Sequence, residues 1–564
     1  MHPRTIGARV AGHAKRKPHE IFCTFLSSQT AEDITFGDLF ERATAYARLY
    51  QARGVRQGDI VIIILRHTPH LYYSFLGALL AGAIPSFMPF PSAKQRSDIY
   101  WHDHESLFER LRPRLVVTYE ENRVAAHAYI DNFSVETLVP SASLCQPSAD
   151  VAPANLPGLA ASVDDVACLQ HSSGTTGLKK GVMLTHRAIL DHTEAYSKRL
   201  SLTSDDCIVS WLPLYHDMGF IACFMTSVIE GTRLIALDPF EWVMRPQLLL
   251  EAIQRYRPSL CWLPNFAFSH IVNATQPSAT FDLSSMRAFV NCSEPCKPGT
   301  FERFLKRFEG GGIRRTNLHV CYALAENVFA ATQTTPDEAA TVIRVDAEAF
   351  STGTILPAGT DKPTQDLLSC GIPLDGVSIA VRGEDGTLLP PDRIGEIFVA
   401  STFLFSGYYL QQDLTETKLH DGWYQTGDLG FIHDGELFVT GRVDDMLIVN
   451  GRNYYAHEIE YLVSEVPGVL AGRSVAIGVD DRQHDATVVI VLVECTEATG
   501  RPDELARVIR RRVLERLGLA IHSIVPLRSG QLVKTTSGKI SRIKNKQLYI
   551  QGTLTPLGDV SATS

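Results

Sequence analysis

The sequence lacks an apolar run long enough to cross a membrane, and residues 1–20 lack the apolar stretch of a signal peptide. The two most hydrophobic segments, 60–65 and 72–87, are shorter than the ~20 residues that a membrane span needs. The eleven cysteines follow no repeated spacing, which argues against a disulfide framework and favours a reducing cytoplasm. Cys292 and Cys296 have no second pair or nearby histidine, so they do not make a zinc site.

An excess of positive charge is also missing. The 53 lysines and arginines are outnumbered by 62 acidic residues, and the net charge of −9 repels the phosphates of DNA and RNA. Nucleic acid is therefore not an expected partner. The 564 residues exceed the roughly 250–300 that one hydrophobic core supports, so we expect two or more domains.

Helical and strand patterns alternate through most of the chain. Thr35 and Asp38 have the spacing of a capping box and Gly54 closes the segment, which predicts a helix over 35–54. The apolar run 59–65 predicts a buried strand, and residues 70–83 predict the next helix. This alternation predicts an α/β fold of doubly wound sheets.

Two breaks in composition divide the sequence. Residues 331–369 are polar and rich in Thr, Asp and Pro, and predict an excursion from the main fold or a long surface loop. After a second break at 441–453, helix and strand patterns form a self-contained α+β unit. We therefore expect a large N-terminal domain of doubly wound sheets with a β-rich subdomain, a hinge, and a small mobile C-terminal domain, at 1–441, 442–445 and 446–564.

Residues 171–186, HSSGTTGLKKGVMLTH, lie between two strand-like runs. Glycines allow a close backbone approach, hydroxyl and N–H groups donate, and Lys180 adds a positive charge, so the loop can bind an anion. It does not have the glycine–lysine spacing of a Walker A motif. By itself the loop is equally consistent with a flexible surface turn.

Five segments together resemble, in order, the motifs of the adenylate-forming superfamily of acyl-CoA synthetases, adenylation domains and luciferases. They are SSGTTGLKKG (172–181), YALAE (322–326), YQTGD (424–428), GRVDD (441–445) and KTTSGK (534–539). The resemblance implies an enzyme that uses ATP and Mg²⁺ to join a carboxylic acid to AMP with release of pyrophosphate.

The resemblance also implies a role for each matched residue. Lys539 is expected to reach the carboxylate and the α-phosphate, with His216 near the carboxylate. Tyr322 would lie against adenine, Glu326 would hold Mg²⁺, and Asp428 would accept both ribose hydroxyls. The other implied residues are the nucleotide contacts Ser172, Ser173, Gly174, Thr175, Thr176, Gly177, Lys180, Ser293, Glu294, Pro295, Ala323 and Arg442, the hinge residue Asp444, and Gly451 of the thiol tunnel.

Three features resemble the fatty acyl-AMP ligases within that superfamily. His216 stands where amino-acid-activating domains carry an aspartate, Ala325 is common in these ligases, and 331–369 looks like the segment that they insert. Such ligases pass the acyl group to the phosphopantetheine arm of an acyl carrier protein, here expected to be a separate chain. By the same resemblance, the residues bordering the acyl pocket would be Met218, Phe220, Trp262, Phe266 and Phe268.

Several alternatives remain open at this level. An acyl-CoA or aryl-CoA synthetase would share the five motifs, and so would a non-catalytic nucleotide-binding relative. Fatty, aryl and short branched acids are all compatible with the aromatic positions, which also suit an ordinary core. The arginines at 510–512 and Arg516 could dock an acidic carrier protein or form a solvated helix face.

Overall fold

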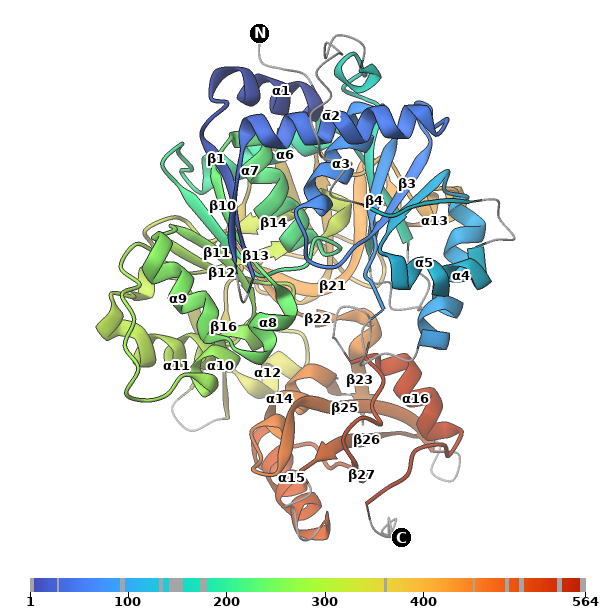
Figure 1. Cartoon of the computed structure of the whole chain (residues 1–564). Coiled ribbons are helices and arrows are strands. Elements are labelled where there is room, and N and C mark those ends of the chain that lie inside the picture. The colour runs from blue at the N-terminus through green and yellow to red at the C-terminus, as the bar shows by residue number, and fades with distance from the viewer. Residues whose placement is uncertain are drawn as a thin grey trace.

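The structure, a computed structural model, describes residues 5–27, 30–91, 97–130, 135–140, 156–172, 180–359, 363–449, 452–481, 486–496, 502–534 and 540–557. Figure 1 shows a large N-terminal part and, beneath it, a smaller C-terminal part coloured orange to red. The chain passes between them at the short turn η9 (Val443–Asp445). In the described part of the chain, no helix is both long and apolar enough to cross a membrane.

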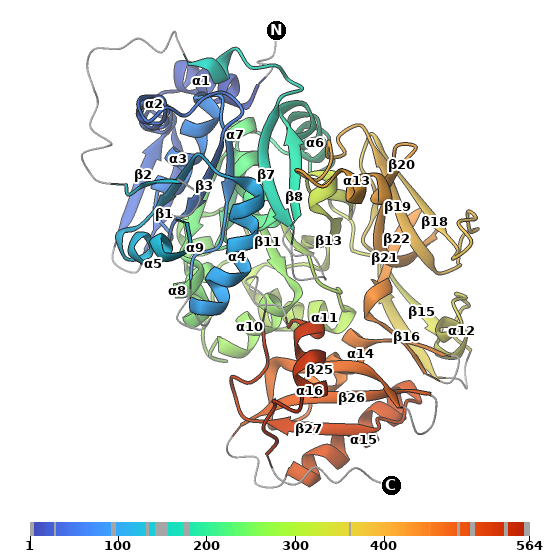
Figure 2. The ribbon, with the colours of Figure 1, turned by 90° about the vertical axis from the view of Figure 1, so that its right-hand side faces the viewer.

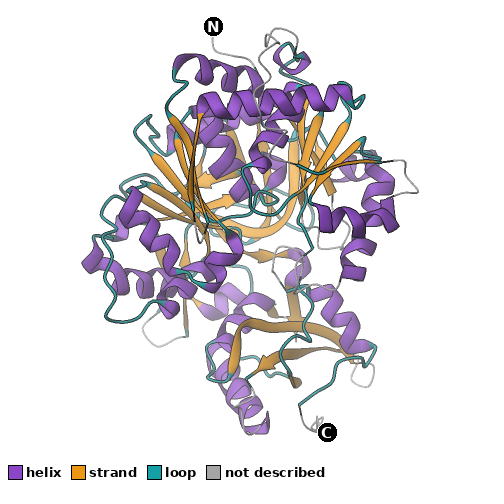
Figure 3. Ribbon diagram, viewed as in Figure 1, coloured by secondary structure: helices purple, strands orange, loops and turns teal. Residues whose placement is uncertain are grey.

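A nine-stranded sheet forms the centre of the N-terminal part. Its inner strands run parallel, while β2, β14 and β17 pair antiparallel at the edges. Helices lie on both faces, as Figure 3 shows, which is the doubly wound arrangement expected from the sequence. The strands, in sheet order, are β17 (Ile372–Pro373), β14 (Ala330–Gln333), β13 (Leu318–Ala323), β12 (Ala288–Cys292), β11 (Leu260–Pro264), β9 (Cys207–Ser210), β10 (Arg233–Leu237), β1 (Ile21–Leu26) and β2 (Ala31–Thr35).

The helices of this part include a π-helix, η5 (Met218–Met225), at whose start Gly219 packs tightly. A Cβ on Gly219 would lie 2.5 Å from the carbonyl oxygen of Pro213, so only glycine allows this contact. The α-helices are α1 (Ile6–Arg16), α2 (Phe36–Ala52), α3 (His70–Leu80), α4 (Ser97–Leu111), α5 (Glu120–Ile130), α6 (His186–Arg199), α7 (Thr226–Glu230), α8 (Pro239–Met244), α9 (Gln247–Tyr256), α10 (Asn265–Ala274) and α11 (Pro298–Phe308).

A second, four-stranded parallel sheet lies beside the first, with the order β4-β3-β5-β6. All five residues of β3 are buried, which confirms the predicted buried strand. The capping box predicted for the helix after β2 is also present: Thr35 Oγ1 accepts from the Asp38 N–H, and Asp38 accepts from the Thr35 N–H. The four strands are β3 (Ile60–Ile64), β4 (Ile84–Phe87), β5 (Leu115–Thr118) and β6 (Glu136–Leu138).

A β-rich subdomain completes the N-terminal part and lies at the right of Figure 2. It contains an antiparallel sheet and a separate hairpin, β15–β16, which carries the short helix α12. The predicted polar excursion begins later than residue 331, because 330–333 form β14 and are fully buried in the central sheet. The elements are β15 (Val342–Asp346), α12 (Ala347–Ser351), β16 (Thr364–Leu368), β18 (Val377–Arg382), β19 (Gly395–Ser401), α13 (Gln412–Lys418), β20 (Leu419–His420), β21 (Trp423–His433) and β22 (Glu436–Arg442).

The C-terminal part has its own core, as the α+β unit in the sequence predicts. A three-stranded sheet, β25-β26-β27, packs between helices, and a hairpin of β23 and β24 leads into it from the turn η9. The elements are β23 (Met446–Val449), β24 (Arg452–Tyr455), α14 (Ala456–Ser464), β25 (Val469–Asp481), β26 (Ala486–Cys495), α15 (Pro502–Leu517), β27 (Ser523–Leu527) and α16 (Arg542–Ile550).

Candidate active site

The predicted phosphate loop joins two strands of an antiparallel hairpin, β7 (Val166–Ser172) and β8 (Lys180–Thr185). Ser172 and Lys180 are paired at its open end, so the two ends of the loop are adjacent. The sequence-based predictions that lie outside the described residues are Ser173, Gly174, Thr175, Thr176, Gly177, Gly451 and Lys539, together with the side chain of Ser172.

The ammonium group of Lys180 lies near the ring of Tyr408 and is affected by the charge of Glu326. The nitrogen lies 5.2 Å from the ring centroid of Tyr408, a favourable cation–π distance. Burial lowers the pKa of Lys180, and the negative charge of Glu326 opposes that shift. The carboxylate of Asp444, the predicted hinge residue, acts on the same ammonium group and also raises its pKa. Two predicted site residues and the predicted hinge residue therefore act on one another electrostatically.

Glu326 lies in the short turn η8 (Ala325–Asn327) that follows β13, and its side chain is buried. Its carboxylate accepts a hydrogen bond of 2.7 Å from the Tyr408 hydroxyl, which is 3.1 Å from the Tyr424 hydroxyl. Sequence reasoning missed Tyr408, because a tyrosine in a loop is equally suited to packing. The tyrosines hold one face of the carboxylate in place.

Asp428 and Arg442 occupy directly opposite positions on β21 and β22. Arg442 Nε donates to one carboxylate oxygen at 2.9 Å, and the Tyr322 hydroxyl donates to the other at 2.6 Å. Burial and the neighbouring carboxylate raise the pKa of Tyr322, so its hydroxyl remains a donor. A carboxylate has about four acceptor positions, so Asp428 keeps capacity for further donors such as a pair of vicinal hydroxyls.

The segment after β12 holds three more predicted nucleotide contacts. Ser293 has a φ of 69°, a left-handed conformation that is uncommon for serine. The Glu294 carboxylate accepts the N–H of Phe266 at 3.0 Å and thereby caps α10, while Pro295 is exposed. Ala323 is the last residue of β13 and pairs with Ala330. The segment after β12 is held to the start of α10 by this hydrogen bond, which the sequence motif did not reveal.

His216 is half-buried just after the turn that precedes η5, and its ring lies 4.8 Å from that of Tyr215. Met218 points its sulfur toward β12, 3.3 Å from the sulfur of Cys292. Phe220 is buried and its ring packs edge-on against that of Phe75.

The other three predicted acyl-pocket residues lie in different surroundings. Trp262 is fully buried in β11, where its indole N–H donates to Tyr196 at 2.8 Å. Phe268 packs against aromatic rings of α11, and Phe266 is 47% exposed. The structure therefore does not bring the five predicted residues together around one cavity.

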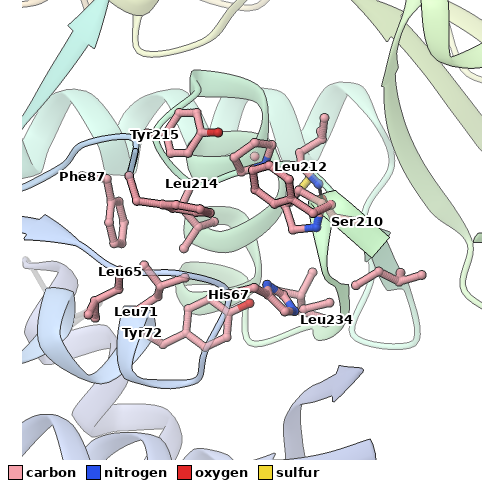
Figure 4. A pocket seen from close by; sticks show the side chains of 18 of the residues that line it. Leu65, His67, Leu71, Tyr72, Phe87, Ser210, Leu212, Leu214, Tyr215 and Leu234 are labelled. Carbon is pink, nitrogen blue, oxygen red and sulfur yellow. Dashed lines mark hydrogen bonds between the residues drawn. The ribbon is translucent and has the colours of Figure 1, made fainter. Parts of the chain in front are cut away.

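An apolar pocket, partly open to solvent, lies beside Tyr215 (Figure 4). None of the five predicted acyl-pocket residues lines it, although Gly219 and Cys223 of the same π-helix do. Its walls come from the carboxyl ends of strands of both sheets, from the loops after them, and from helices α3, η5 and α8. The lining residues are Leu65, His67, Leu71, Tyr72, Phe87, Met88, Phe90, Ser210, Leu212, Pro213, Leu214, Tyr215, Gly219, Cys223, Leu234, Ala236, Leu237, Pro239 and Phe240.

The segments flanking the Lys539 motif are anchored to the C-terminal core. Glu494 is fully buried and accepts the N–H groups of Gly530 and Leu532 at 2.9 and 2.7 Å. The Asn545 side chain bonds both main-chain groups of Val533. On the other flank, Arg542 donates to Asp445 of the turn η9 at 2.9 Å. One flank is therefore fixed to the C-terminal core and the other to the turn η9.

The residues present fit a Mg²⁺ ion that arrives with a nucleotide. Within the described ranges, no three His, Cys, Asp or Glu side chains are grouped so as to hold a metal by themselves. Mg²⁺ is usually bound through one or two carboxylates, with waters and substrate phosphates as its other ligands. Glu326, a buried carboxylate beside Lys180, can supply that protein ligand.

Comparisons with known proteins found similar sequences and similar structures. The model of the family described as "AMP-binding enzyme" matches residues 10–409. A medium-chain-fatty-acid–[acyl-carrier-protein] ligase, JamA of Moorena producens, is 33% identical over 69% of each chain, and a long-chain-fatty-acid–AMP ligase, FadD26 of Mycobacterium tuberculosis, is 28% identical over 96% of each. A structure from a study of fatty acyl-adenylate ligases from E. coli and L. pneumophila superposes with a TM-score of 0.88 at 26% identity, covering 97% of this chain and 98% of that one.

Proposed function

The chain belongs to the AMP-binding enzyme family, and from that premise we propose that it activates a fatty acid with ATP. The first product is an acyl-adenylate, formed as the carboxylate oxygen attacks the α-phosphorus and pyrophosphate leaves. The acyl group then passes to the phosphopantetheine thiol of an acyl carrier protein, with release of AMP. The nucleotide part of this proposal rests on the Asp428 carboxylate, which Arg442 and Tyr322 hold in place by hydrogen bonds.

In the first step, two anions must be brought together and further charge develops on the phosphates. Preorganised cations and donors aimed at that charge give the largest catalytic effect. We assign this task to Lys180 and Lys539, with the phosphate loop and Ser293 as further donors. Mg²⁺, when bound at Glu326, would neutralise phosphate charge. Asp428 would orient the ribose, and His216 would lie near the carboxylate of the acid.

We propose a carrier protein as the acceptor because the β15–β16 hairpin and its helix α12 contact the C-terminal part and would restrain it. Gln365 of β16 donates to Glu458 of α14, and Lys297 approaches the same carboxylate at 4.0 Å. Burial raises the pKa of Glu458 above its ordinary value. Phe350 of α12 packs against Tyr455 with ring centroids 6.0 Å apart. These contacts favour one orientation of the C-terminal part over the others that a different acceptor would require.

Deleting residues 342–368 should therefore increase the rate of acyl-coenzyme A formation about tenfold. This change corresponds to lowering the activation free energy by about 1.4 kcal/mol. The ends to be joined are close, because the Ser369 N–H donates to the Thr341 carbonyl at 2.9 Å, so a short glycine linker closes the gap. Arg344→Ala, which breaks only an exposed ion pair of the hairpin, is the matched control and should change nothing. A product profile unchanged by the deletion, with adenylate formation intact, would contradict the restraint.

The proposed function is tested by pyrophosphate release from ATP with a panel of fatty and aryl acids. We expect release that depends on a fatty acid, with the acyl-adenylate identified by mass spectrometry. Release with none of the acids would refute acid activation. Rapid conversion to a coenzyme A thioester would place the chain among the acyl-CoA synthetases.

A further inference from the structure

Tyr408 lies where the phosphate loop, the turn that carries Glu326 and strand β21 come together. It pairs antiparallel with Val182 of β8, the strand that follows the phosphate loop. The next residue continues this pairing, because the Tyr409 N–H donates to the carbonyl of Gly181 at 2.8 Å. Figure 2 shows the hairpin of β7 and β8 beside the β-rich subdomain that supplies Tyr408. The backbone of Tyr408 is therefore fixed against the strand that ends the loop.

The segment around Tyr408 also contacts the turn that carries Glu326. The Phe405 N–H donates to the main-chain carbonyl of Glu326 at 2.8 Å. The N–H of Tyr408 itself donates to Oγ1 of Thr415 at 2.9 Å. The ring of Tyr408 is buried and packs edge-on against that of Phe405, with centroids 4.9 Å apart. Because its main chain and its ring are both held, the Tyr408 hydroxyl has a fixed position.

The Tyr408 side chain connects two groups of opposite charge. Its hydroxyl donates to Oε1 of Glu326 at 2.7 Å, and the ammonium nitrogen of Lys180 lies 5.2 Å from its ring centroid. The Tyr424 hydroxyl lies 3.1 Å from that of Tyr408 and extends the hydrogen-bond chain into β21. A carboxylate has about four acceptor positions, so Glu326 keeps capacity for a cation. Groups that hydrogen-bond a metal-binding carboxylate orient it, and removing one typically weakens metal binding about 10–100-fold.

We infer that Tyr408 is a positioning residue, whose hydroxyl orients the Glu326 carboxylate that would hold the divalent cation of the nucleotide. The inference rests on the proposed function, because it assumes that a nucleotide and its cation bind at this site. Tyr408 acts through Glu326 and not through the nucleotide. Removing its hydroxyl should therefore weaken binding of the cation and leave binding of the cation-free nucleotide unchanged.

The test uses Tyr408→Phe in the full chain, which removes the hydroxyl and keeps the ring beside Lys180. The nucleotide is α,β-methylene-ATP, which cannot release pyrophosphate, and the cation is Mn²⁺, which is followed by electron paramagnetic resonance. We expect the Kd of Mn²⁺ for the enzyme–nucleotide complex to rise about tenfold or more. The Kd of the nucleotide measured in EDTA, by calorimetry, should not change. In pyrophosphate release, the Mg²⁺ concentration that gives half the maximal rate should rise by a similar factor.

Tyr50→Phe is the matched control, because Tyr50 is fully buried and its hydroxyl donates to the main-chain carbonyl of Ser74 at 3.2 Å, within the packing of α2 on α3. This substitution should leave the Kd of Mn²⁺ unchanged. Tyr424→Phe removes the hydroxyl next to that of Tyr408 and should weaken Mn²⁺ binding by a smaller factor. Thermal melting of each variant separates loss of folding from loss of positioning.

Two results would overturn the inference and leave the proposed function standing. One is a Kd for Mn²⁺ that is unchanged in the folded Tyr408 and Tyr424 variants. The other is an equal loss of affinity for the nucleotide with and without the cation, which would indicate a general structural role. Wild-type enzyme that binds the nucleotide and Mn²⁺ but releases no pyrophosphate from ATP with any acid would instead overturn the proposed function.

Discussion

Lys539→Ala should reduce acyl-adenylate formation about 10²–10³-fold, because it removes a preorganised cation from the charge that develops on the α-phosphate. ATP binding should be nearly unchanged, since Asp428, Arg442 and Tyr322 keep their contacts in the N-terminal part. The measurements are pyrophosphate release under saturating acid and equilibrium binding of ATP.

The effect of this substitution should be local. Glu494 and Asn545 anchor one flank of the motif and Arg542 anchors the other, without using the lysine side chain. Lys534→Ala, at the start of the same motif, is the matched control and should cost far less. Equal turnover by Lys539→Ala and wild-type enzyme would refute the role assigned to this lysine.

Asp428→Ala should raise the KM for ATP about a hundredfold. Hydrogen bonds to a charged group are worth about 1.5–3 kcal/mol each, and the substitution removes those proposed to both ribose hydroxyls. It also leaves Arg442 and the buried Tyr322 hydroxyl without their acceptor. Steady-state kinetics with varied ATP would measure the change.

The control for Asp428 is Asp434→Ala, at the turn between the same two strands. Its side chain is 92% exposed, so removing it should leave both kinetic constants almost unaltered. A hundredfold loss confined to kcat, with the KM for ATP unchanged, would contradict a role in holding the ribose. Circular dichroism of both variants would show that the strand pair is intact.

Local features of the fold could be predicted from the sequence. The capping box of α2 depends on residues three apart, and the buried strand β3 is a continuous apolar run. Such signals do not require knowledge of distant neighbours. The mixed α/β class followed from their alternation along the chain.

Long-range contacts could not be predicted in the same way. Tyr408 and Glu326 are 82 positions apart, and nothing in the neighbourhood of either identifies the other as its partner. Glu294 was expected to face a nucleotide, but its carboxylate caps α10 through a residue 28 positions away. Motif similarity identified the residues of the site without revealing which of them hold one another.

The acyl pocket shows a different limit. Aromatic residues such as Trp262 and Phe268 suit a substrate wall and a packed core equally well, and both are fully buried among other side chains. The residue type at these positions therefore does not indicate which side chains face a cavity. The walls of the pocket beside Tyr215 come from strand ends in two sheets and from helices α3, η5 and α8, a juxtaposition that only the folded chain reveals.

The most direct test of the central proposal is a competition between two acceptors. Purified enzyme, ATP and its preferred fatty acid would be incubated with equal concentrations of a phosphopantetheinylated carrier protein and coenzyme A, and both thioesters quantified by mass spectrometry. We predict acyl-carrier protein as the main product, with acyl-adenylate accumulating when the carrier is omitted. Acyl-coenzyme A as the main product would contradict transfer to a carrier and identify the enzyme as a coenzyme A ligase.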